Sequence, residues 1–75
     1  MNQELLIFPN PSNGQFNIQL EGDYTFEVLD SRGRLVINDN ANENHTIDLS
    51  EYEAGVYYIR INRDGEIAVR KLMLK

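Results

Sequence analysis

The sequence predicts an all-β protein, a small antiparallel immunoglobulin-like β-sandwich of six to seven strands. Apolar and polar residues alternate with a period of two through most of the chain, which is typical of strands that are buried on one face. Glycine, asparagine, aspartate and proline recur between these segments at roughly ten-residue intervals, which is typical of the turns of a sandwich. With 75 residues, the chain is expected to form one domain.

The chain opens with a strand and a rigid corner. The first strand is expected over Glu4–Phe8, and Pro9 ends it because proline has no N–H to donate to a strand ladder. Pro11 follows two residues later, and Asn13-Gly14 then supplies the positive φ of a tight turn. So stiff a corner lowers the conformational entropy of the unfolded chain, which favours the folding of a domain with a small core.

The other strands are bounded by turn residues. They are expected at Gln15–Leu20, Tyr24–Leu29, Arg34–Ile37, Thr46–Leu49, Val56–Asn62 and Glu66–Leu74. Gly33 stands where a four-residue turn needs the left-handed conformation, and Asp64-Gly65 predicts a two-residue hairpin. The polar stretch Asn38–His45 predicts a solvated loop, and Ser50–Gly55 has room for one helical turn.

The last predicted strand has a conflict of phase. Ile67 and Val69 share one face, whereas Leu72 and Leu74 fall on the opposite face. A strand that is covered on both faces would resolve the conflict. A β-bulge near Arg70-Lys71 that resets the alternation would also resolve it, and it is the interpretation that we favour.

Composition excludes several classes of function. Twelve acidic and seven basic residues give a net charge of −5, which argues against binding to nucleic acid or to an anionic membrane surface. The chain has no cysteine, so disulfides and thiolate metal sites are excluded. Its apolar runs are too short to span a membrane.

No constellation of reactive side chains is found, and we expect no catalytic residue, no metal site and no cofactor. The single histidine, His45, ends a polar stretch and is interpreted as a solvated loop residue. The acidic pairs Glu21/Asp23 and Glu51/Glu53 sit at turns, where water reaches them. The residues after Asp39 lack the glycine and glutamate of a calcium-binding EF-hand loop. The protein is therefore not expected to be an enzyme.

An alternative function rests on the tyrosines. Tyr24, Tyr52, Tyr57 and Tyr58 could form a platform for sugar rings, as in a fibronectin-like accessory module that binds carbohydrate or a surface partner. Strand alternation places Tyr57 and Tyr58 on opposite faces, however. The inward tyrosine is better explained as a core residue or as a tyrosine corner.

Four stretches in order resemble a known family. They are "PNPSNGQFNI" (Pro9–Ile18), "LDSRGRLV" (Leu29–Val36), "IDLSEYEAGVYYIRI" (Ile47–Ile61) and "RKLMLK" (Arg70–Lys75). Together they resemble the C-terminal sorting domain of type IX secretion cargo, type A form, from about residue 6 to the end. The resemblance implies that residues 1–75 are one C-terminal sorting domain, a piece of a longer secreted protein.

The resemblance also implies partners and a route. An outer-membrane translocon recognises the folded domain in the periplasm, and a surface sortase then removes it. The cargo is left at the cell surface or outside the cell. The family's three internal motifs match Pro9, Asn10, Pro11 and Gly14, then Gly33 and Arg34, then Gly55, Val56 and Tyr57. The chain departs from the family at Tyr52, where leucine is more frequent.

The terminal segment is the expected recognition surface. It comprises Arg70, Lys71, Leu72, Met73, Leu74 and Lys75, which match the part of the family on which export depends. A last strand that nothing follows is expected to present an uncovered edge, to which another protein can add a strand. The same exposed edge leaves self-association of the domain open.

Overall fold

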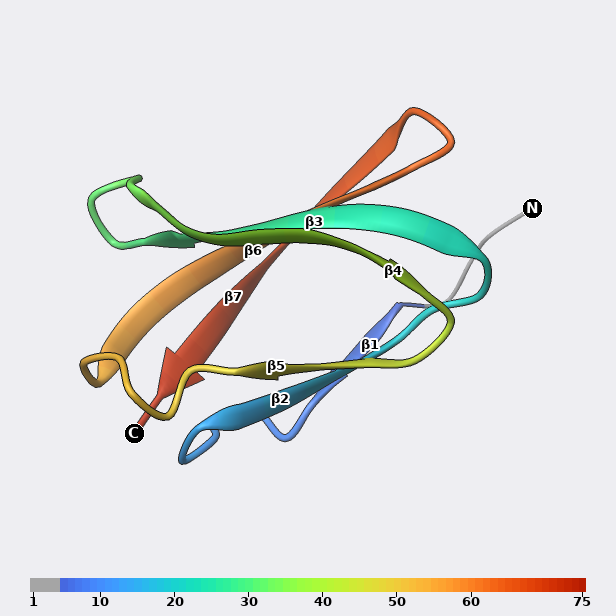
Figure 1. Cartoon of the computed structure of the whole chain (residues 1–75). Coiled ribbons are helices and arrows are strands. Elements are labelled where there is room, and N and C mark those ends of the chain that lie inside the picture. The colour runs from blue at the N-terminus through green and yellow to red at the C-terminus, as the bar shows by residue number, and fades with distance from the viewer. Residues whose placement is uncertain (1–4) are drawn as a thin grey trace.

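Two antiparallel sheets stack face to face in the computed structural model, which describes residues 5–75 (Figure 1). The strands are β1 (Leu6–Phe8), β2 (Gln15–Gln19), β3 (Asp23–Asp30), β4 (Leu35–Asn42), β5 (His45–Asp48), β6 (Gly55–Arg63) and β7 (Glu66–Leu74). One sheet has the order β1-β2-β5, and the other has the order β4-β3-β6-β7. The predicted all-β sandwich is confirmed. Residues 5–75 contain no helix that could cross a membrane.

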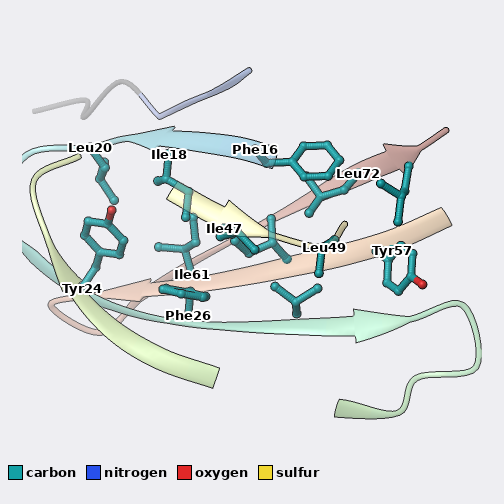
Figure 2. Packing of buried hydrophobic residues seen from close by; sticks show 13 residues of the cluster. Phe16, Ile18, Leu20, Tyr24, Phe26, Ile47, Leu49, Tyr57, Ile61 and Leu72 are labelled. Atoms are coloured by element: carbon teal, nitrogen blue, oxygen red, sulfur yellow. The ribbon is translucent and has the colours of Figure 1, made fainter. Parts of the chain in front are cut away.

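The core lies between the sheets and is built from alternate residues of five strands and their ends (Figure 2). It consists of Phe16, Ile18, Leu20, Tyr24, Phe26, Val28, Ile47, Leu49, Tyr57, Ile59, Ile61, Leu72 and Leu74. The period of two in the sequence therefore places the apolar side chains inward, as predicted. A core of this size leaves a net stability of about 3–5 kcal/mol, so that each buried side chain matters.

The last strand contains no bulge, and the bulge predicted near Arg70-Lys71 is wrong. The register between β6 and β7 is unbroken along its whole length. The conflict of phase is resolved by exposure instead. Leu72 and Leu74 are buried, whereas Ile67 and Val69 lie on the outer face with 59% and 53% of their surface exposed. Apolar residues on that face misled the prediction because alternation alone does not say which face is covered.

The predicted loop over Asn38–His45 is also wrong, because β4 continues through most of it. Residues 38–42 pair with residues 23–27 of β3. Polar side chains are compatible with this strand because it lies at the edge of its sheet, where water reaches them. His45 is not a loop residue: it begins β5, and its ring centroid lies 5.2 Å from that of Phe26.

The turns follow the sequence with two exceptions. Asp64 and Gly65 have φ values of 53° and 84° and form the predicted hairpin, and Gly33 has the predicted left-handed φ of 85°. The segment Ser50–Gly55 forms a turn and no helix. Its Tyr52 N–H donates to the Leu49 carbonyl at 3.0 Å. At the start of the chain, β1 begins at Leu6, and the predicted strand residue Glu4 lies outside the described residues.

Gly14 is the second exception. Neither Asn13 nor Gly14 has a positive φ, so the expected left-handed turn is wrong. The glycine is required for space instead, because a Cβ at this position would lie 3.0 Å from the Cβ and 3.2 Å from the Cα of Ser50. The Gly14 carbonyl also accepts a hydrogen bond of 2.7 Å from the Leu49 N–H. The segments just before β2 and just after β5 thus lie too close together for a side chain at position 14.

Candidate functional site

The terminal strand β7 lies at one edge of the four-stranded sheet and pairs with β6 on its inner side. In an antiparallel ladder, one residue directs both its N–H and its C=O to one side of the strand, and the next residue directs both to the other side. Every second residue of β7 therefore turns its backbone groups away from β6, toward the sheet edge. What these groups meet decides whether the strand is available to another protein.

Asn10 and Ser12 cover the C-terminal half of this edge. The Asn10 side chain donates from Nδ2 to the Lys71 carbonyl at 2.8 Å and accepts from the Met73 N–H at 2.9 Å. The Ser12 N–H donates to the Met73 carbonyl at 2.9 Å, and the Ser12 carbonyl accepts from the Lys75 N–H at 2.8 Å. We call residues 10–12 the clasp. The expectation that nothing covers the edge of the terminal strand is therefore wrong for its C-terminal half.

The residue types of the clasp explain its geometry. Pro9 and Pro11 have no backbone N–H, so the chain between them cannot offer the full pattern of a strand. The carboxamide of Asn10 carries both a donor and an acceptor, and it replaces the missing backbone groups. Ser12 is buried, and its Oγ accepts from the Gly14 N–H at 3.1 Å and donates to the Gln15 carbonyl. This small network fixes the path of the chain from the clasp into β2.

Replacing Asn10 with alanine is expected to lower the free energy of unfolding by about 1–2 kcal/mol, because two hydrogen bonds are lost. Amide hydrogen exchange should accelerate most at the Met73 N–H, which bonds to Asn10, and less at the neighbouring Leu72 N–H, which points toward β6. Asn13→Ala, at an exposed position three residues on, serves as the matched control. Equal exchange at Met73 in both variants would contradict the clasp.

The six residues of the terminal segment divide by face. Leu72 and Leu74 are buried in the core, with 0% and 5% of their surface exposed, so a partner cannot touch these side chains while the domain is folded. Lys71 and Met73 alternate with them and point outward, and Arg70 and Lys75 are also exposed. The prediction that this segment is the recognition surface stays a prediction. Within the segment, only the exposed side chains of Arg70, Lys71, Met73 and Lys75 can contact a partner of the folded domain.

Sequence reasoning missed an apolar patch beside these exposed residues. Tyr58, Ile67, Val69 and Met73 are all more than a third exposed on the outer face of β6 and β7, and we call them the outer patch. Lys71 stands directly opposite Tyr58 in the ladder and gives the patch a positive charge at its middle. The alternation of β7 contained the signal, because its two apolar sets cannot both face inward.

The second and third motifs meet in a groove of about 630 Å³, at the end of the sandwich where β7 ends. Arg34 lines it from the β3–β4 turn, and Gly55 and Tyr57 line it from the start of β6. Tyr57 has the predicted tyrosine-corner geometry, since its hydroxyl donates to the Glu53 carbonyl at 2.6 Å. Burial first, and then the charge of Glu53, raise the pKa of Tyr57 above its ordinary value.

An ion pair holds the β3–β4 turn beside this groove. Arg34 Nε lies 2.9 Å from Asp30 Oδ2, and Asp30 Oδ1 accepts the N–H groups of Arg32 and Arg34, each at 2.9 Å. The hydrogen bond from the Arg34 backbone, followed by that from its side chain, lowers the pKa of Asp30 below its ordinary value of 3.8. The arrangement fixes a turn that lies in open solvent.

Acid sensitivity follows from this lowered pKa. Because the folded state holds the Asp30 proton more weakly than the unfolded state, the stabilisation is present above about pH 3.8 and is lost as the pH falls further. Asp30→Asn should therefore lose less stability than the wild type when urea unfolding is repeated at pH 5 and pH 3. An identical loss in the two proteins would contradict this assignment.

The remaining candidates from the sequence are a metal site and the four tyrosines. Among residues 5–75, no three histidine or acidic side chains lie close enough to hold a metal ion. The four tyrosines form no common platform, because Tyr24 and Tyr57 are in the core and only Tyr52 and Tyr58 are exposed. The Tyr24 hydroxyl is occupied by a hydrogen bond of 2.7 Å to the Glu43 carbonyl.

Comparison with protein families gives a match over residues 6–75 to the family described as secretion system C-terminal sorting domain. Comparison with curated proteins gives no match. The family match covers every described strand, including the clasp and the terminal segment.

Proposed function

The chain belongs to the family of type IX secretion C-terminal sorting domains, and on that premise we propose that it is the folded address label of a longer cargo protein. The family implies export through the type IX system to the cell surface or the extracellular space. It is not known for enzymatic activity. The domain acts as a substrate of the secretion machinery, crosses the periplasm in its folded form, and is read there by the outer-membrane translocon.

The recognition surface that we propose is the exposed side of the terminal segment. The single observation that carries it is the division of β7, in which buried Leu72 and Leu74 alternate with exposed Lys71 and Met73. The inward pair anchors the strand, while β6 holds one edge of β7 and the clasp holds the C-terminal half of the other edge. The outward side chains are thereby presented in one fixed arrangement, which reduces the entropy lost when a partner binds.

Charge adds selectivity to this surface. Arg70, Lys71 and Lys75 gather three of the seven basic residues at one end of a chain with net charge −5. A partner with an acidic site would orient the domain by this end, because complementary charge steers association more than it strengthens it. In the same proposal, the surface sortase cuts before the domain, as expected of the type A form, and releases the cargo from its label.

The experiment is to fuse residues 1–75 to a fluorescent reporter that carries an inner-membrane export signal, in a bacterium with a type IX system. Fluorescence at the cell surface or in the medium is the expected result. Reporter retained in the periplasm, with the domain folded, would contradict the proposal. Deleting Lys71–Lys75 is not an adequate test, because the deletion also removes Leu72 and Leu74 from the core.

A further inference from the structure

The N-terminal half of the β7 edge is uncovered in the part of the chain that the structure describes. Met73 directs both its N–H and its C=O to the clasp. Ile67 and Val69 are six and four residues from Met73, both even numbers, so their backbone N–H and C=O groups point to the same edge as those of Met73. The clasp reaches no further back along β7 than the Lys71 carbonyl. At Val69, the carbonyl accepts a hydrogen bond of 3.0 Å from the exposed Arg70 guanidinium of the same strand.

This open half also carries exposed apolar side chains. Ile67 and Val69 are 59% and 53% exposed, and both lie on the outer face of the sheet. An uncovered strand edge with apolar side chains pairs readily with another strand unless charge or proline prevents it. The charges of this segment lie at its two ends, with Glu66 at one and Arg70 at the other, and Ala68 is at its centre.

We propose that the open edge binds a second copy of the same chain, with the two β7 strands antiparallel and Ala68 opposite Ala68 on the two-fold axis. Ile67 then stands opposite Val69 of the second copy, and the two residues exchange backbone hydrogen bonds, about four in all. Glu66 stands opposite Arg70 of the second copy, on the other face. Such pairs, which exchange no backbone hydrogen bonds, bring their side chains closest together. The segment is self-complementary in charge, which identifies a second copy as the occupant.

The neighbouring registers fit less well. A shift of two residues in one direction places the turn residue Gly65 opposite Val69 of the second copy. Arg70 then has no residue of the second copy's β7 opposite it. A shift in the other direction places Ile67 opposite Lys71, whose carbonyl the clasp already occupies. The register centred on Ala68 uses the whole open edge and pairs residues 66–70, with which the clasp makes no hydrogen bond. It also leaves Lys71, Met73 and Lys75 exposed for the proposed recognition.

A contact of about five residues on each chain is small, so the dimer is weak and depends on concentration. Sedimentation velocity of the 75-residue chain, from about 10 µM to 1 mM, should show the sedimentation coefficient rising toward that of a dimer. Glu66→Lys and Arg70→Glu should each weaken the dimer by roughly tenfold or more, because each puts like charges opposite one another. The double variant restores the opposite charges and should dimerise within about threefold of the wild type.

Arg32→Glu changes the charge as much as Arg70→Glu does, but it lies in the β3–β4 turn, so dimerisation of this control should be unchanged. Circular dichroism establishes that each variant is folded. A wild-type chain that stays monomeric throughout the range would overturn the proposal. A folded double variant that stays as weak as the single variants would overturn it as well, because the register requires the exchange of charges to be neutral.

Discussion

Leu72→Ala is expected to lower the free energy of unfolding by about 2–5 kcal/mol, which is most of the stability available to a domain of this size. Leu72 is fully buried on the terminal strand and stands opposite Tyr57 in the ladder. Truncation removes its contacts and leaves a cavity between the two sheets. Urea unfolding followed by circular dichroism measures the loss.

Met73→Ala is the matched control for this substitution. It shortens the neighbouring side chain on the same strand, but that side chain points outward and is 38% exposed. Its cost should be within about 0.5 kcal/mol, as for surface substitutions in general. Comparable losses for the two variants would show that the inward and outward faces of β7 are not as assigned.

Gly14→Ala is expected to be the next most damaging small change, with a loss of about 1–3 kcal/mol. The added methyl would meet the Ser50 Cβ at 3.0 Å and its Cα at 3.2 Å, so the backbones of two strands would have to move apart. The hydrogen bond from the Leu49 N–H to the Gly14 carbonyl joins the same two segments and would be strained by that movement. Thermal unfolding measures the effect.

Ser50→Gly supplies the test of this cause. It removes the Cβ that the new methyl would meet, so the double variant should recover part of the stability that Gly14→Ala loses. Simple addition of the two losses, with no recovery, would contradict the steric explanation and would favour a conformational requirement at position 14.

Local features of the fold could be predicted from the sequence, whereas features made by distant residues could not. The Asp64-Gly65 hairpin was predictable because two adjacent residues determine its backbone conformation. At position 14 the sequence indicated that glycine matters, but it did not indicate why. A requirement for space depends on Ser50, which only the folded structure brings near.

The two wrong assignments of secondary structure have the same origin. Residues 38–42 form a strand because β3 supplies a partner, although their side chains have no apolar period. Ile67 and Val69 were expected to be buried because they are apolar, yet no strand among residues 5–75 covers their face. In both cases the surrounding structure, and not the local pattern, decides the outcome.

The clasp was the least predictable part of the candidate site. Its hydrogen bonds join residues at opposite ends of the chain, such as Asn10 and Lys71, which are 61 positions apart. The sequence did contain a local sign, an asparagine between two prolines, which also matches the first motif of the sorting-domain family. Only the structure shows that this asparagine takes the place of a neighbouring strand.

In the proposed function, the export machinery reads the exposed side of the terminal segment. The most direct measurement is surface delivery of the reporter fusion with Lys71→Glu and Lys75→Glu combined, beside a fusion with Arg32→Glu. Both charged side chains of the test variant are exposed, so the domain should stay folded. Delivery should fall at least about tenfold in the test variant and stay unchanged in the Arg32 control. Full delivery of the folded test variant would contradict it.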